Sequence, residues 1–275
     1  MRFKSFFIFF SFLFLLISCK KENVDEETEV SKGEGNIIFK FSHKADGNDI
    51  KYDTLMYINA AGNHYMINEI QYFISDVTLY KSTGEKLLIK ADKDIHYVDI
   101  DISSTLVWNV YDKIPEGSYD SINFIFGIPG NKNIPYMFVN PPESNMFWPY
   151  FLGGPNGGYH YLKLNGKWLN ANGVVTPFDF HLGVGQIYAG NVPVVDSIVG
   201  YIQNYFTVSL PNSSFNITNG QVMEIQIVME VQNWFNNPVY DHNVYGSYTM
   251  QNQQAMQSIK DNGNDVFSIG YFKVL

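Results

Sequence analysis

The chain has 275 residues, which is enough for one large all-β domain or two small ones. Aromatic and charged residues each make up 16% of it, a composition that excludes a disordered protein, because disorder requires low hydrophobicity and high charge. The formal net charge of −9 argues against nucleic-acid binding, since that function needs a basic surface. The single cysteine excludes intrachain disulfides and cysteine-rich zinc sites.

The N-terminus has the pattern of a bacterial lipoprotein signal. Arg2 and Lys4 are followed by an apolar run over residues 6–17 that is too short for a membrane span, and the only cysteine, Cys19, comes directly after it. This arrangement resembles a lipobox, so we predict a signal peptide over residues 1–18 and acylation of Cys19. Lipidation would hold the mature protein on a membrane. The alternative is an ordinary signal peptide with a chance cysteine.

Residues 19–35 are predicted to form a flexible tether, because they are polar, acidic and almost free of large apolar side chains. An acidic segment after a lipidated cysteine resembles the surface-export signals of Bacteroidota lipoproteins, and a solvated spacer explains the composition equally well. The expected location is the cell envelope, as an outer-membrane lipoprotein that is periplasmic or surface-exposed.

Residues 36–275 are predicted to form one all-β domain, a β-sandwich or open barrel with long aromatic loops and a short C-terminal helix. Asn165-Gly166 and Asn172-Gly173 are typical turn signals between strands. Two segments favour helix, residues 231–236 and residues 249–262. Runs typical of strands are residues 38–41, 72–80, 95–100, 121–128, 159–164, 178–181, 205–210 and 223–231.

The longest irregular stretch, residues 127–158, is rich in proline, glycine and aromatic side chains. Long loops in compact domains are usually functional or disordered, and this aromatic density favours a packed or ligand-facing loop. Its large apolar residues are Met137, Phe138, Met146, Phe147, Trp148, Tyr150 and Phe151.

No motif of a known catalytic class is present: there is no GxSxG, HExxH, P-loop or strand-linked GxGxxG. We therefore expect a binding protein and not an enzyme.

A weaker hydrolase interpretation rests on Asp179 and His181, which lie two residues apart on one strand and so face the same side. The same spacing suits a carboxylate that orients a metal-bound histidine. None of the six histidines forms HxH or HxxxH, so any metal site must be assembled from different strands.

Several segments resemble the copper-binding MbnP-like domain family, over roughly residues 36–270. The Trp148 and His181 motifs are the most specific of them. The segments are Phe41-Ser42-His43, Tyr57-Ile58-Asn59, Glu69–Asp76, Phe126–Pro129, Met146-Phe147-Trp148, Gly158-Tyr159 with Leu162-Lys163-Leu164, and Phe178–Gly183.

The resemblance implies a β-sandwich copper protein, secreted or lipid-anchored, that holds copper through two histidines and a kynurenine derived from tryptophan. A partner di-haem enzyme of the cytochrome c peroxidase type makes the kynurenine in characterised relatives. Residue by residue, the resemblance implies His181 as a metal ligand and Trp148 as the modified residue. Asp179 is the candidate carboxylate for orienting His181.

The chain departs from the family pattern after the Gly-Ile-Pro turn, where a histidine is expected. The sequence there is Asn131-Lys132-Asn133. His160 and His43 are the candidates to replace the missing ligand, and the thioethers of Met137 and Met146 would suit Cu(I).

The sequence therefore predicts a lipid-anchored copper-binding protein of the cell envelope, concerned with copper acquisition or handling. The alternative is a surface lipoprotein that binds a glycan or peptide through its aromatic loop without a metal. That alternative requires Trp148, Tyr150 and Tyr159 to be exposed as a stacking platform.

Overall fold

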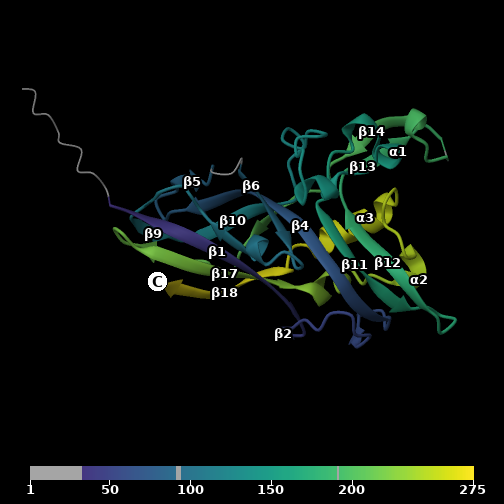
Figure 1. Cartoon of the computed structure of the whole chain (residues 1–275), viewed down its shortest axis with the longest axis horizontal. Coiled ribbons are helices and arrows are strands. Elements are labelled where there is room, and N and C mark those ends of the chain that lie inside the picture. Colours follow the sequence, from purple (N-terminus) through teal and green to yellow (C-terminus); the bar gives the residue numbers. More distant parts are fainter. Residues whose placement is uncertain (1–32, 91–93, 191) are drawn as a thin grey trace, which may run out of the picture. The chain divides into compact units, whose positions relative to one another are not determined.

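Two main β-sheets face each other in the described part of the chain (Figure 1). The computed structural model describes residues 33–90, 94–190 and 192–275. The predicted signal peptide, the lipidation at Cys19 and most of the tether lie outside the described residues. The tether prediction extends too far, because Glu34 and Gly35 already belong to the first strand.

The first sheet has the order β18-β17-β1-β2, with β7 and β8 also paired to β1. Strands β1 and β17 run parallel, and the other pairs are antiparallel. The strands are β1 (Glu34–Ala45), β2 (Asn48–Asp49), β7 (Val107–Asn109), β8 (Ile114–Pro115), β17 (Val222–Glu230) and β18 (Phe267–Val274).

The second sheet has the order β12-β11-β4-β10-β15, with β3, β5 and β6 also paired to the long strand β4. It supplies most of the candidate site. The strands are β3 (Tyr57–Ile58), β4 (His64–Tyr80), β5 (Lys86–Leu88), β6 (Ile95–Asp99), β10 (Ser121–Phe126), β11 (Leu162–Leu169), β12 (Val175–Leu182) and β15 (Phe206–Ser209).

Two small hairpins and several short helices complete the described structure. The hairpins pair β9 (Gly117–Tyr119) with β16 (Phe215–Ile217) and β13 (Gly185–Tyr188) with β14 (Ile198–Ile202). The α-helices are α1 (Tyr150–Gly153), α2 (His242–Tyr245) and α3 (Gln253–Asn262), and the 3₁₀ turns are η2 (Ser103–Leu106), η3 (Glu143–Met146), η4 (Gly154–Asn156), η5 (Val195–Ser197) and η6 (Val231–Phe235). No helix among the described residues is long and apolar enough to cross a membrane.

The core lies between the two sheets and is built from alternating apolar residues. Along β1 every second side chain is buried, as period-two alternation predicts. On the facing sheet, Tyr72 of β4 contacts the rings of Phe41, Phe126 and Phe267. The all-β prediction with aromatic loops and a short C-terminal helix is thus confirmed.

Three local predictions differ from the structure. Asn165-Gly166 is not a turn but part of β11, because the strand bulges there and passes so close to β4 that a Cβ on Gly166 would overlap the Met66 carbonyl. The strand predicted from residue 159 begins only at Leu162. The aromatic loop contains a short helix, α1, which its proline and glycine content does not indicate.

Candidate metal centre

Trp148 and His160 are brought together by a strand-like pairing inside the aromatic loop. The amide of Trp148 donates to the carbonyl of Gly158 at 2.8 Å, and the amide of His160 donates to the carbonyl of Met146 at 2.7 Å. An isolated bridge joins the two residues between them, Phe147 and Tyr159. As a result, the indole and imidazole rings lie with centroids 4.5 Å apart.

His181 reaches the same place from β12. Its backbone is fixed by Thr249, whose hydroxyl accepts from the His181 amide and lies 2.7 Å from the His181 carbonyl. The His181 ring meets the His160 ring edge to face, with centroids 4.9 Å apart. The structure therefore joins Trp148, His160 and His181 from a loop, the start of a hairpin and its second strand.

Each of the two imidazoles has one nitrogen that is hydrogen-bonded and one that is buried without a partner. His160 Nδ1 lies 2.9 Å from the Met146 carbonyl, and His181 Nε2 lies 2.7 Å from Asn165 Oδ1. An oxygen of this kind only accepts, so the bonded nitrogen carries the proton in each ring. The lone pairs are left on His160 Nε2 and His181 Nδ1, both of which are buried and unbonded.

Both imidazoles are neutral at physiological pH. Burial holds the pKa of His160 well below its ordinary value, and the neighbouring His181 and the Lys163 ammonium lower it further. Burial, with a smaller effect of Lys163, lowers the pKa of His181 to about 3. Neutral imidazole is the form that binds a metal ion, so both rings can act as ligands at neutral pH.

Trp148 is completely buried and is held against glycine backbone on two sides. A Cβ added to Gly153 would overlap its five-membered ring, and one added to Gly183 would overlap its six-membered ring. Gly157 is nearly as close to the first of these edges, at 3.1 Å. The indole Nε1 is buried without a hydrogen-bond partner. The absence of a side chain at these glycines leaves room for the indole ring.

His43, the other predicted replacement ligand, lies away from this pair. Its ring contacts Tyr72, which faces the core between the sheets. Gln71, which precedes Tyr72 on β4, is in register with Lys163, and Lys163 is in register with His181. Because successive side chains point to opposite faces, His43 and His181 lie on opposite faces of the second sheet. The structure gives His160, not His43, as the neighbour of His181.

The hydrogen bond that orients His181 comes from Asn165 and not from the predicted Asp179. Asp179 sits beside Asn165 in register on β12, and its backbone bonds to Ser247 and Thr249. Met146 contributes its carbonyl to His160.

Among the described residues, no group of three or more His, Cys, Asp or Glu side chains is placed to hold a metal ion.

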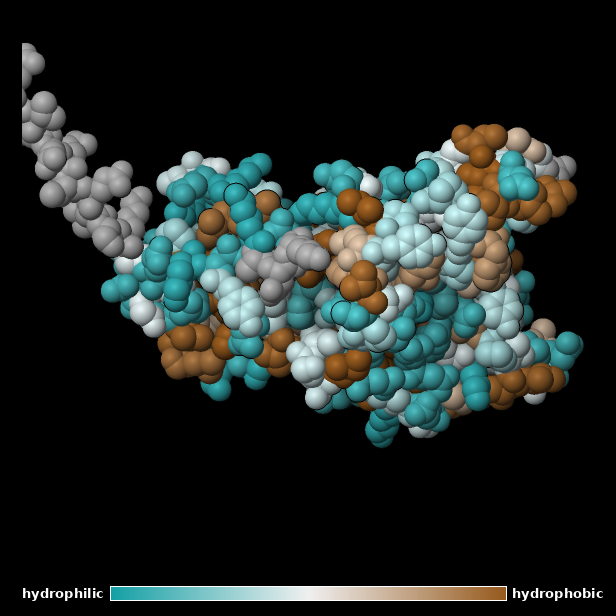
Figure 2. All heavy atoms as spheres, turned by 45° about the horizontal axis from the view of Figure 1, so that its top comes forward, coloured by the Kyte–Doolittle hydropathy of each residue, from teal (hydrophilic) through white to brown (hydrophobic). Residues whose placement is uncertain are grey.

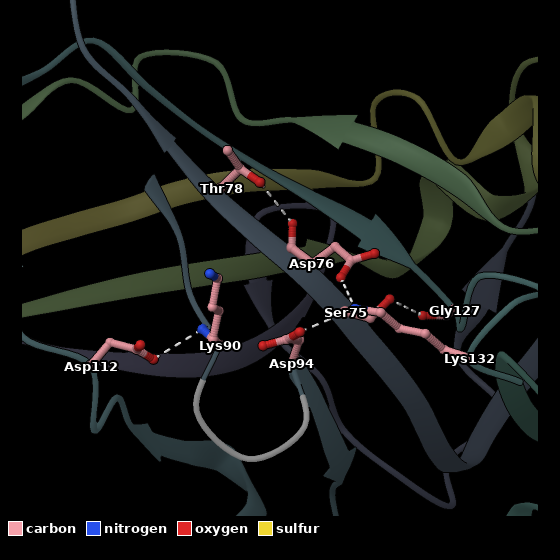
Figure 3. Close-up of polar contacts among 8 residues, drawn as sticks. All are labelled: Ser75, Asp76, Thr78, Lys90, Asp94, Asp112, Gly127 and Lys132. Carbon is pink, nitrogen blue, oxygen red and sulfur yellow. Dashed lines mark hydrogen bonds and ion pairs between the residues drawn. The ribbon is translucent and has the colours of Figure 1, made fainter. Parts of the chain in front are cut away.

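Lys132 stands where the family pattern has its histidine region, and it takes part in a separate cluster (Figure 3). Its ammonium forms ion pairs with Asp76 and, at 3.2 Å, with Asp94. Both carboxylates lie near a backbone irregularity of β4, where Asp76 has a positive φ of 52°. The next residue, Asn133, accepts from the Tyr159 amide and so supports the loop that carries His160.

The aromatic loop does not form the exposed stacking platform that the alternative function needs. Trp148 and Tyr159 are fully buried, so that expectation is wrong for both, and of the three only Tyr150 is exposed, at 53%. Figure 2 shows hydrophobic side chains gathered instead over α1 and the β13–β14 hairpin. Exposed residues of that region include Phe151, Ile187, Val192, Val194 and Val199.

Sequence reasoning missed Asn165, Glu69 and the glycines around Trp148. The sequence does not indicate the role of Asn165, because Asn-Gly is a strong turn signal and so predicts a turn at this position. The alternation of Lys163 and Asn165 on the strand before a clear Asn172-Gly173 turn is the signal that could have placed them opposite His181 and Asp179.

Comparison with known proteins agrees with the sequence resemblance. A family model described as MbnP matches residues 34–255. Among solved structures, MbnP from Methylosinus trichosporium is similar, with 13% sequence identity and a TM-score of 0.46 over 74% of this chain and 77% of that chain. A search of curated proteins finds no match.

Proposed function

Since this chain belongs to the MbnP family, which is associated with copper handling, we propose that it binds one copper ion between His160 and His181. The observation that carries the proposal is the meeting of two buried, neutral imidazoles, each with its unbonded nitrogen free for a ligand bond. Imidazole nitrogen suits copper in either oxidation state. A buried polar nitrogen without a hydrogen-bond partner lowers the stability of the folded protein. A metal ion bound to His160 Nε2 and His181 Nδ1 would give both nitrogens a partner.

The donor set favours Cu(I) over Cu(II) or zinc. Structural zinc sites use four ligands, and Cu(II) prefers tetragonal sites rich in nitrogen and oxygen. Here the described residues offer two imidazoles and no third ionisable ligand. The site is buried, so a single positive charge costs less desolvation than two. Low coordination by neutral donors in a buried site is therefore best suited to the monovalent ion.

Trp148 is the proposed source of a further nitrogen donor. Its indole nitrogen has a delocalised lone pair and is a poor ligand, whereas kynurenine carries an aromatic amine. The conversion cleaves the Cγ–Cδ1 bond with uptake of two oxygen atoms from peroxide, and hydrolysis then releases Cδ1 as formate. Support comes from the family resemblance and from the 4.5 Å contact between the Trp148 and His160 rings. A di-haem peroxidase-type partner would supply the oxidation.

The protein is proposed to act as a lipid-anchored binding protein of the cell envelope and not as an enzyme. Support comes from the lipobox-like N-terminus with its sole cysteine, Cys19, and from the absence of catalytic motifs in the sequence. A tethered copper site of this kind would acquire or hold copper outside the cytoplasm.

Competition for Cu(I) with a chromophoric chelator tests the metal site. The wild-type protein is expected to take up one Cu(I) per chain, and His181→Gln is expected to lose this uptake. His64→Gln is the matched control, because His64 is an exposed histidine on β4. Unchanged Cu(I) affinity in His181→Gln would overturn the proposed site.

Intact mass of the protein from its native host tests the modification. A gain of roughly 4 Da at Trp148, for one carbon lost and one oxygen gained, is expected. An unmodified Trp148 in copper-loaded protein would remove the kynurenine from the proposal and leave the two histidines as its ligands.

A further inference from the structure

Asn165 lies between His181 and a carboxylate on the neighbouring strand. Its Oδ1 is 2.7 Å from His181 Nε2, and its Nδ2 donates to Glu69 Oε2 at 2.5 Å. Glu69 belongs to β4 and Asn165 to β11, where the two residues are in register. The sheet therefore supports a continuous row from Glu69 through Asn165 to His181.

The chemistry of the row fixes the direction of each hydrogen bond. A carboxylate only accepts, so the amide group of Asn165 that faces Glu69 must be its NH₂. The oxygen of Asn165 then faces His181 and also only accepts. The proton of His181 must consequently be on Nε2. The lone pair is then left on Nδ1, which is buried and has no hydrogen-bond partner.

We propose that Glu69 is a positioning residue that sets the tautomer of His181 through the amide of Asn165. The inference rests on the proposed copper function for its purpose, but the tautomer itself is a property of the metal-free protein. Hydrogen bonds to an ionised carboxylate are stronger than neutral ones, so Glu69 holds the amide in one of its two orientations.

The two histidines of the site differ in a way that explains why a carboxylate is needed for one of them only. His160 is bonded to the backbone carbonyl of Met146, which cannot exchange a donor for an acceptor. His181 is bonded to a side-chain amide, which can turn over and present its NH₂ instead. In that orientation Asn165 would favour the proton on Nδ1 and block the lone pair that the metal needs.

Asp179 offers a matched control for Glu69. It flanks Asn165 in register from the opposite strand, so it places a second carboxyl group beside the same residue. The hydrogen bonds of Asn165 run to Glu69 and His181. Asp179→Asn and Glu69→Gln each remove one carboxylate next to Asn165, but only the second breaks the row.

The first test is nitrogen-15 NMR of histidine-labelled, copper-free protein, with the His181 ring signals assigned by their loss in His181→Gln. Wild type and Asp179→Asn are expected to show a proton on Nε2 and none on Nδ1. Glu69→Gln is expected to show a mixture of both tautomers, since a glutamine can serve either orientation of Asn165. Asn165→Leu is expected to show the same mixture and serves as a second variant if Glu69→Gln fails to fold.

A reversed pair distinguishes the hydrogen-bond row from a merely structural contact. In Glu69→Gln combined with Asn165→Asp, the glutamine can donate to the aspartate, and the aspartate can accept from His181 Nε2. The Nε2-protonated tautomer is therefore expected to return. A wild-type tautomer in Glu69→Gln, or a persistent mixture in the reversed pair, would overturn the inference.

Cu(I) competition then connects the tautomer to binding. Glu69→Gln is expected to weaken Cu(I) affinity by about 10-fold, the usual effect of losing a partner behind a ligand, with recovery in the reversed pair. Equal affinity of Glu69→Gln and wild type would show that the tautomer has no role in binding. If wild type takes up no Cu(I), the proposed function fails while the NMR comparison still decides the inference.

Discussion

Two regions of the molecule each place a buried histidine against a tryptophan, and only one of them resembles a metal site. At one, His160 lies 4.5 Å from Trp148; at the other, His242 lies 5.1 Å from Trp168. In both regions the histidine Nε2 is buried without a hydrogen-bond partner. The contact between the two ring types therefore does not by itself distinguish a ligand from a core residue.

The regions differ in what lies beyond the histidine. His160 meets His181, whose unbonded nitrogen is a second donor. His242 meets Phe178 and Tyr240, and Tyr240 offers only a phenol. A buried imidazole surrounded by aromatic carbon is a packing group, whereas two such rings that meet can share a metal ion. The presence of His181 beside His160 is thus the feature that distinguishes the candidate metal site from the aromatic cluster around His242.

Replacing one histidine in each region gives the largest expected contrast. His160→Ala should lower Cu(I) affinity by more than about 100-fold, because it removes a proposed ligand, and losing a partner behind a ligand already costs about 10–100-fold. His242→Phe keeps a ring in the aromatic cluster and should leave Cu(I) affinity within about 2-fold, well under 1 kcal/mol. Chelator competition measures both, and a comparable loss in the two variants would break the comparison.

The two tryptophans also differ in how they are held, since glycine backbone packs against Trp148, whereas the His242 ring stacks on Trp168 and the indole of Trp168 donates to Ser247 Oγ. Gly183→Ala should reduce the free energy of unfolding by about 1–3 kcal/mol, as overpacked cores do, because its Cβ would overlap the Trp148 ring. Chemical denaturation measures the change.

Gly200→Ala is the control for that substitution. Its Cβ would contact the Ile187 side chain, most closely the flexible Cδ1 at 3.3 Å, and the expected change is within about 0.5 kcal/mol. Equal effects of the two alanines would show that Trp148 has room to move.

Much of the fold could be predicted from the sequence because its strands follow the period-two pattern. Residues 72–80 lie within β4, the strand predicted over residues 223–231 matches β17 up to Glu230, and Asn172-Gly173 does connect β11 to β12. Helix α1 could not be predicted, since its four residues lie between prolines and glycines and depend on packing. Asn165-Gly166 was mistaken for a turn because close strand approach and tight turns both select glycine.

The candidate site was only partly accessible from the sequence. The motifs around Trp148 and His181 predict two of its residues. His160 is one of the two candidates, with His43, to replace the histidine ligand that the sequence lacks. Choosing His160 over His43 required knowing which face of the sheet each side chain occupies. Glu69 and Asn165 depend on the register of β4 with β11, across a bulge, which no local pattern specifies.

Acid should affect both regions alike, because burial and not metal binding sets the protonation of their histidines. Burial lowers the pKa of His242 to about 4 from its ordinary 6.5. Between these values the unfolded chain takes up a proton that the folded chain does not, so stability falls as pH decreases, by about 1.4 kcal/mol per pH unit.

His242→Phe should therefore make the loss of stability between about pH 6 and about pH 4.5 shallower by that slope. His181→Gln should have a similar effect, since burial lowers the pKa of His181 to about 3. Denaturation at several pH values measures the slopes. Parallel curves for wild type and His242→Phe would mean that His242 is protonated in the folded protein.

The smallest expected effect concerns Lys132, in the region where the family pattern has a histidine. Its ammonium is turned toward Asp76 and Asp94, at the β4 irregularity (Figure 3). A histidine introduced there would lie among carboxylates, so Lys132→His should change Cu(I) affinity by less than about 2-fold, far below the effect of removing a ligand. It should also lose part of a partly exposed ion-pair cluster, at a cost of up to about 1 kcal/mol. Chelator competition and denaturation measure the two effects. A marked gain in Cu(I) affinity would show that the loop can bring position 132 to the two histidines. It would also show that the site lacks a ligand which a histidine at this position can supply.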